Sequence, residues 1–154
     1  MPSRVVRPTS RTLMISRGDW LLVKDRLNHG EQQDAFARRY VTNALGGHSV
    51  NLRAQGMEKV TAYLLEWNLT GPDDTHVLPL RNVAGELDPI VMAASLNAID
   101  PESFAEIFNA IEGHETAMAA ARAEEKKLQA GESASSATSP SPAPVPGPSE
   151  TSAT

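Results

Sequence analysis

The chain has 154 residues, a formal net charge of −5 and no cysteine. The absence of cysteine excludes a disulfide framework and any metal site built on thiolates. Its apolar runs are only a few residues long, which argues against a membrane-spanning helix. The N-terminal residues are basic and lack the apolar stretch of a secretory signal, so we expect a soluble intracellular protein.

The charge is unevenly distributed along the chain. Residues 1–60 carry a net charge of +5 and residues 61–125 a net charge of −10. Opposite charges on the two halves can attract each other within one chain or between copies, so a homo-oligomer is compatible with the sequence. The alternative is that both are simply solvated faces.

Composition divides the chain into three parts. Residues 1–11 are expected to form a flexible basic arm, and residues 12–129 a single globular domain with a projecting C-terminal helix. Residues 130–154 are rich in Ser, Pro and Ala and hold one large apolar residue, Val145. Such a segment buries too little surface to offset its ordering entropy, which predicts a disordered tail.

Two short apolar runs, Thr12–Ile15 and Trp20–Val23, begin the expected domain. Gly18 between them permits the positive φ of a tight turn, so a β-hairpin is predicted. The alternative is a helix over residues 19–27, capped by Asp19, because the period of such short runs is ambiguous.

The middle of the chain favours helices. Residues 31–41 are expected to form a helix that ends at Gly46-Gly47, and residues 48–53 a short strand. From Met57 a helix is expected to run to about Trp67, because four apolar residues recur at helical spacing: Val60, Tyr63, Leu64 and Trp67. Residues 76–80 are expected to be an extended strap across the core.

Two further helices are expected to begin at Asp88-Pro89 and Asp100-Pro101, where an N-cap acceptor precedes a proline. After Gly113, another helix is expected from His114 to about Gln129. The sequence thus predicts a mostly helical α+β domain: an N-terminal β-hairpin, four to five helices and a disordered tail. The predicted structural core is Trp20, Tyr63, Leu64, Trp67, Phe104, Ile107, Phe108 and Ile111.

No motif indicates catalysis. His114-Glu115 lacks the second histidine of a zinc-protease helix, since Met118 stands there, and the other histidines are scattered. Adjacent carboxylates such as Asp73-Asp74 diverge on a chain, which is unsuited to acid–base work. We therefore predict a non-enzymatic protein with no catalytic residue, no metal and no cofactor, and partner-binding residues stay unassigned.

The order of motifs resembles one family. Trp20–Glu31 reads as a strand leading into a Leu-x-x-Gly-Glu helix start, followed by Tyr63–Leu69, Val77–Pro79 and Leu96–Ile107, with His114-Glu115 at the end. This order is similar to small tail assembly chaperones of long-tailed bacteriophages that infect actinobacteria and related hosts. The resemblance covers about residues 12–115, and excludes the arm and the tail.

The resemblance implies a non-enzymatic partner-binding role. Such chaperones bind the tape measure protein, keep its apolar helices soluble and help tail tube subunits polymerise around it. They act in the host cytoplasm and leave the finished virion. Two alternatives remain: a minor structural virion protein for tail completion or head–tail connection, and a nucleic-acid-binding regulator that uses Arg4, Arg7 and Arg11 of the basic arm. No membrane partner is expected.

Overall fold

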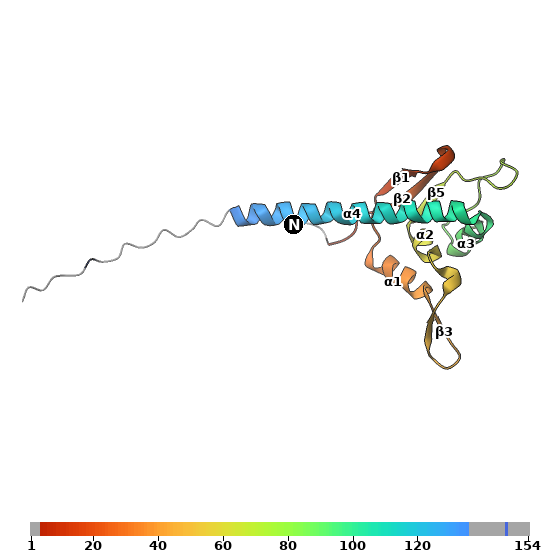
Figure 1. Cartoon of the computed structure of the whole chain (residues 1–154), viewed down its shortest axis with the longest axis horizontal. Helices are drawn as coiled ribbons and strands as arrows, with labels where there is room; N and C mark the ends of the chain where they lie inside the picture. The colour runs from red at the N-terminus through yellow and green to blue at the C-terminus, as the bar shows by residue number, and fades with distance from the viewer. Residues whose placement is uncertain (1–3, 136–146, 148–154) are drawn as a thin grey trace, which may run out of the picture. The chain divides into compact units, whose positions relative to one another are not determined.

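The computed structural model of the chain describes residues 4–135 and residue 147 (Figure 1). The chain divides into two compact units, Met1–Ala120 and Ala121–Thr154. The described part is α+β, with an N-terminal β-hairpin and four α-helices, which confirms the expected fold class at this level. The prediction that the disordered tail begins at residue 130 is wrong, because residues 130–135 still belong to a helix, α4 (Pro101–Ser135). The rest of the expected tail, except residue 147, lies outside the described residues.

The N-terminal hairpin consists of β1 (Ser10–Met14) and β2 (Trp20–Lys24), and β5 (Leu64–Trp67) completes an antiparallel sheet in the order β1-β2-β5. The prediction of a hairpin rather than a helix over residues 19–27 is confirmed. Arg17 and Gly18 both adopt positive φ, which reverses the chain between the strands. Leu21 and Val23 alternate with half-buried residues, so one face of β2 is buried in the core.

Helix α1 (His29–Arg38) begins with a capping box, in which the Asn28 and Glu31 side chains each accept a backbone N–H of the other. The prediction that this helix continues toward Gly46-Gly47 is wrong. Strands β3 (Tyr40–Thr42) and β4 (His48–Val50) follow instead as a two-stranded hairpin. The Asn43 side chain accepts the N–H groups of Leu45 and Gly47, which stabilises a turn in place of a further helical turn.

A 3-10 turn (Leu52–Ala54) leads to α2 (Met57–Tyr63). The prediction of one helix to Trp67 is wrong, because the backbone becomes extended at Leu64 and pairs with β2 as β5. The four residues of the predicted stripe are nevertheless all buried. An apolar pair in α2, Val60 and Tyr63, and another at the two ends of β5, Leu64 and Trp67, reproduced the spacing of a longer helix.

Helices α3 (Pro89–Ala98) and α4 (Pro101–Ser135) begin at the two predicted Asp-Pro sites. The prediction of a break at Gly113 is wrong, since α4 runs through it. Glycine within a helix costs about 1 kcal/mol relative to alanine, and the Ala-rich sequence that follows propagates the helix despite this cost. No helix among the described residues has the length and apolarity needed to cross a membrane.

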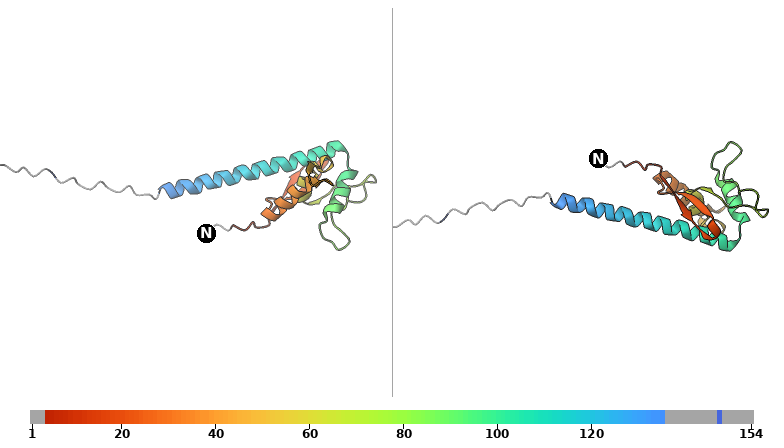
Figure 2. Two further views of the ribbon diagram at one scale, coloured as in Figure 1. Left: turned by 90° about the horizontal axis from the view of Figure 1, so that it is seen from below. Right: turned by 90° about the horizontal axis from the view of Figure 1, so that it is seen from above.

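The core of the first unit lies between the sheet and the first part of α4, which run side by side in the views of Figure 2. Of the predicted core residues, five are buried: Tyr63, Leu64, Trp67, Ile107 and Ile111. Phe104 and Phe108 are half-buried and pack against this cluster, while Trp20 is half-buried on β2. The core also contains residues of β2, α2 and α3 outside the predicted core set: Leu21, Val23, Val60, Met92 and Leu96.

Candidate functional site

An open groove with an acidic rim lies where three segments of the first unit meet. The segments are the β1–β2 loop, the loop that follows β5, and the junction of α3 and α4. The groove has a volume of about 430 Å³ and is lined by Arg17, Asp19, Leu69, Thr70, Gly71, Pro72, Asp74, Leu78, Ala98, Ile99, Asp100 and Ser103. We call these residues the acidic groove.

Backbone hydrogen bonds fix one wall of the groove. The N–H of Leu78 donates to the carbonyl of Leu69 at 2.8 Å, and the Trp67 indole Nε1–H donates to the carbonyl of Leu78 at 2.9 Å. The expected extended strap over residues 76–80 is therefore tied to the end of β5. Leu69 is 9% exposed and Leu78 packs against the core, so the groove borders the hydrophobic interior at these two residues, while most of its accessible lining is polar.

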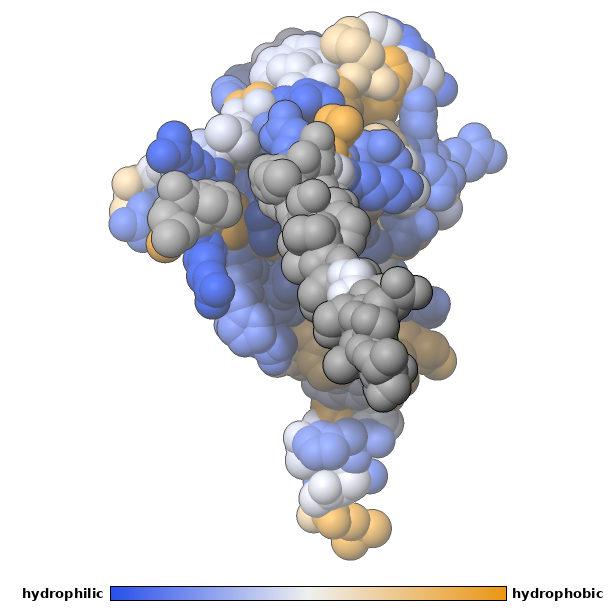
Figure 3. Space-filling view, turned by 90° about the vertical axis from the view of Figure 1, so that its left-hand side faces the viewer, coloured by the Kyte–Doolittle hydropathy of each residue, from blue (hydrophilic) through white to orange (hydrophobic). Residues whose placement is uncertain are grey.

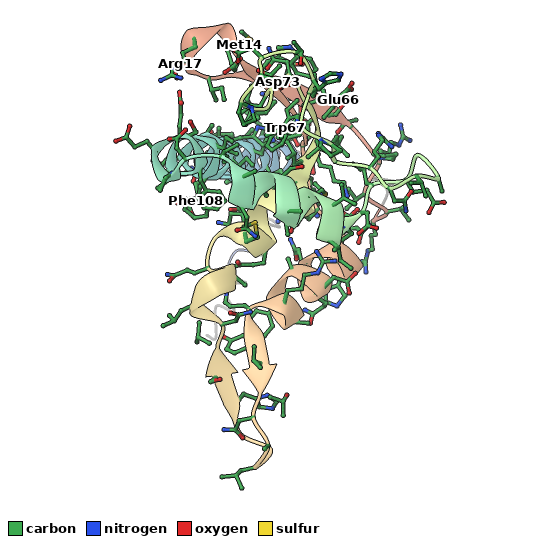
Figure 4. All side chains as sticks on the ribbon, turned by 90° about the vertical axis from the view of Figure 1, so that its right-hand side faces the viewer. Met14, Arg17, Glu66, Trp67, Asp73 and Phe108 are labelled. Atoms are coloured by element: carbon green, nitrogen blue, oxygen red, sulfur yellow. The ribbon has the colours of Figure 1, made fainter. Side chains whose placement is uncertain are left out.

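The rim carries more negative than positive charge. Asp19, Asp74 and Asp100 face a single cation, Arg17, which makes no ion pair among the described residues. An adjoining cleft of about 150 Å³ adds Glu102 and Glu106. Figure 4 shows Arg17 on the β1–β2 loop. Such a field attracts basic groups and repels phosphates.

Hydrogen bonds hold the carboxylates on the α4 side. The Ser103 hydroxyl donates to Asp100 Oδ2 at 2.6 Å and the Ser103 N–H donates to Oδ1 at 2.8 Å, and these bonds lower the pKa of Asp100. Glu106 accepts the N–H and hydroxyl of Ser16 at 2.6 and 2.8 Å. The bonds between Ser16 and Glu106 attach the β1–β2 loop to α4. Because its pKa is lowered, the Asp100 carboxylate stays ionised at pH values at which an ordinary aspartate begins to take up a proton.

A second acidic position lies on the loop beyond the groove. The Thr75 hydroxyl donates to Asp73 Oδ2 at 2.7 Å, which is the main reason that the pKa of Asp73 is lowered. The His76 Nδ1 lies 3.5 Å from the same oxygen, but the His76 side chain is largely exposed. This loop adds negative charge next to the groove without forming an enclosed site.

The groove is lined by carboxylates, hydroxyls and apolar side chains. The Ser103 hydroxyl donates to Asp100, and no histidine is among the residues that line the groove. Within residues 4–135 and 147, no three His, Asp or Glu side chains converge as metal ligands do. Carboxylates around apolar residues suit the binding of a segment that presents both basic and apolar side chains.

The histidines weighed as metal ligands lie on different elements of the fold. His29 is at the start of α1, His48 is on β4, and His76 is on the loop after β5. His114 is buried and contacts the backbone carbonyl of Lys24. The sequence analysis named no residue of the groove as a site, because the groove draws on residues 17–19, 69–78 and 98–103, which are distant along the chain.

No protein-family model, no curated protein and no solved structure matches the chain. The fold and the groove describe a small α+β domain with an acidic, open surface site.

Proposed function

We propose that the chain is a non-enzymatic tail assembly chaperone of a long-tailed bacteriophage that binds the tape measure protein in the acidic groove. The observation that carries the proposal is the combination of apolar residues at Leu69 and Leu78 with carboxylates at Asp19, Asp74 and Asp100. An apolar helix with basic flanking residues is complementary to both features. The motif order over residues 12–115 supports the assignment to tail assembly.

Charge also suits a protein that keeps another chain soluble. The net charge of −5 opposes self-aggregation, and the acidic residues are concentrated between residues 61 and 125, which include most of the groove. In this proposal the protein acts in the host cytoplasm, assists tail tube polymerisation around the tape measure protein, and is absent from the mature virion.

The test is co-expression of the full chain with an apolar fragment of the tape measure protein from the same phage. We expect the wild type to raise the soluble fraction of the fragment. The double variant Asp19→Asn, Asp74→Asn should lose most of this effect, because it removes two rim charges while asparagine tolerates the positive φ of Asp74. A matched control is Asp34→Asn, Glu125→Gln, which removes two exposed charges outside the groove.

Two results would count against the proposal. One is an unchanged soluble fraction with the wild-type chain. The other is abundant protein in purified virions by mass spectrometry, which would favour the minor structural virion protein. Salt-dependent retention on DNA would favour the regulator that uses the basic arm.

A further inference from the structure

The β3–β4 hairpin is an exposed arm with unusually apolar residues. All six strand residues are exposed, on both faces of the two-stranded sheet. Two-stranded hairpins are marginally stable alone, and this one contacts the rest of its unit mainly near the end of α1. Figure 3 shows hydrophobic surface at the far end of this arm.

The turn of the arm presents one apolar side chain. The Asn43 side chain accepts the N–H of Leu45 at 3.1 Å and the N–H of Gly47 at 2.8 Å, and Gly46 adopts positive φ. Leu45 is 96% exposed. The turn thus holds one large apolar side chain in water at the end of the arm.

The base of the same arm carries an apolar depression. It has a volume of about 430 Å³ and is lined by Phe36, Ala37, Tyr40, Thr42 and His48. The Phe36 and Tyr40 rings lie 4.9 Å apart and are partly exposed. The arm therefore carries both an apolar projection and an apolar recess.

No strand of the described part of the chain pairs with the outer edge of β3. The N–H of Asn51 donates to the carbonyl of Arg39, and the N–H of Asn43 donates to the carbonyl of Gly47, both at 2.8 Å. Because hydrogen-bonded pairs alternate in an antiparallel ladder, the backbone groups of Tyr40 and Thr42 point away from β4. Neither strand contains the lysine, proline or bulge that commonly protects an edge.

We propose that two copies of this chain associate through antiparallel pairing of their β3 edges about a two-fold axis at Val41. Tyr40 of each copy then pairs with Thr42 of the other, through the backbone groups that point outward. This pairing joins an aromatic and a β-branched side chain across the strands, a favourable combination. The result is a four-stranded sheet with the order β4-β3-β3-β4.

The register of this pairing explains the turn and the recess together. With Tyr40 opposite Thr42, the β3–β4 turn of one copy extends past Tyr40 of the other toward the end of its α1. Leu45 in that turn then lies on the side of the depression that Phe36, Ala37 and Tyr40 line. Pairing through the outer edge of β4 would instead extend the turn toward Leu52–Ala54, which do not line the depression.

The buried area predicts a weak dimer. Phe36 is 54%, Tyr40 38%, Val41 48% and Leu45 96% exposed. At roughly 150–200 Å² for a large side chain, these residues offer about 400 Å² per copy. With the strand edges included, the total is on the order of 1,000 Å², the lower limit for a specific interface, so we expect a dissociation constant in roughly the micromolar range.

The first test is the mass of the full chain in sedimentation equilibrium from about 1 to about 200 µM, since dimerisation depends on concentration. We expect a monomer–dimer equilibrium. Leu45→Asp should raise the dissociation constant of the dimer at least about tenfold, because two leucines per dimer lose their apolar contact. Val83→Asp, which places the same charge at another fully exposed residue, is the matched control and should leave it unchanged.

The second test uses the absence of cysteine from the chain. Val41 of the two copies would form a non-hydrogen-bonded pair with Cα atoms about 4.5 Å apart, inside the range for a disulfide. Val41→Cys should therefore form a covalent dimer under mild oxidation much faster than Ser49→Cys, its exposed neighbour on β4.

A monomer at all concentrations, or equal crosslinking of the two variants, would overturn the proposal. So would a monomer whose Leu45→Asp variant loses only tape measure binding, since the arm would then serve that partner. Neither test depends on the proposed chaperone function.

Discussion

His114 Nε2 lies 3.0 Å from the backbone carbonyl oxygen of Lys24, and this hydrogen bond joins α4 to the end of β2. The His114 side chain is 2% exposed, and Asp25 Oδ1 lies 3.9 Å from the same nitrogen. A buried polar contact of this kind fixes the position of α4 against the sheet. Its loss leaves polar groups without partners.

Replacing His114 with leucine should therefore destabilise the fold. We expect the free energy of unfolding to fall by about 1–3 kcal/mol, because the hydrogen bond to the Lys24 carbonyl is lost from a buried site. Urea denaturation followed by circular dichroism measures this change. His76→Leu is the control, and its effect should stay within about 0.5 kcal/mol because that side chain is exposed. Equal effects of the two variants would contradict the structural role of His114.

A methyl group at Gly56 should be costly for two separate reasons. Gly56 has φ +84°, and a Cβ there would lie 3.2 Å from the Phe108 ring. Gly85 also has positive φ, at +79°, but a Cβ there meets nothing within 4 Å. We expect Gly85→Ala to cost about 1 kcal/mol and Gly56→Ala roughly 1–3 kcal/mol more. Thermal unfolding of both variants isolates the Phe108 contact as their difference, and similar melting temperatures would show that this contact is absent.

Ile107 should be among the most sensitive apolar positions. It is fully buried, whereas Ile90 is 81% exposed near the start of α3. Ile107→Ala should lower the free energy of unfolding by about 2–5 kcal/mol, through lost burial and a residual cavity. Ile90→Ala makes the same chemical change at the surface and should shift it by less than about 0.5 kcal/mol. Guanidinium denaturation compares them, and a small effect at Ile107 would disprove the packing of α4 on the sheet.

Lys59 should make stability dependent on alkaline pH. Partial burial lowers its pKa, but ion pairs with Glu115 at 2.7 Å and Glu112 at 2.9 Å outweigh burial and raise the pKa above its ordinary value. A raised pKa contributes stability that is complete below the unfolded value of about 10.4 and is lost as the pH rises through the folded value. The melting temperature of the wild type should thus exceed that of Lys59→Met by an amount that is constant near neutral pH and that decreases above about pH 10.

The control for this experiment is Lys127→Met. Lys127 makes only an exposed ion pair with Glu124, three residues away on α4, so its removal should change stability little at any pH. A gap for Lys59→Met that does not change with pH would show that the lysine acts through packing, including its position 5.8 Å from the Phe108 ring centre, rather than through charge.

Local signals predicted the N-terminal hairpin and the starts of α3 and α4. Gly18 and the two Asp-Pro pairs act through their own backbone preferences, so the turn and the helix starts can be predicted without knowledge of distant contacts. The helix expected over residues 57–67 failed because burial at Leu64 and Trp67 arises from pairing with β2, more than forty residues earlier. Tertiary pairing overrode a local period there.

The acidic groove could not be predicted from the sequence for the same reason. Asp19, Asp74 and Asp100 are distant in the sequence, and each alone resembles a turn or cap residue. The pairing of β2 with β5 and the contact of Ser16 with Glu106 help to bring the three loops together. Turn chemistry at Gly71–Asp74 indicated a loop but gave no sign of what that loop faces.

The contacts around β2 determine when this domain can fold during synthesis. Strand β2 needs β5 at its second edge, and the bonds from Ser16 to Glu106 and from His114 to Lys24 each span ninety residues. A nascent chain that ends before Glu106 exposes Leu21 and Val23 without their covering helix. We therefore expect protease resistance to develop only after the ribosome has released the chain beyond His114, so the domain folds late in translation rather than segment by segment.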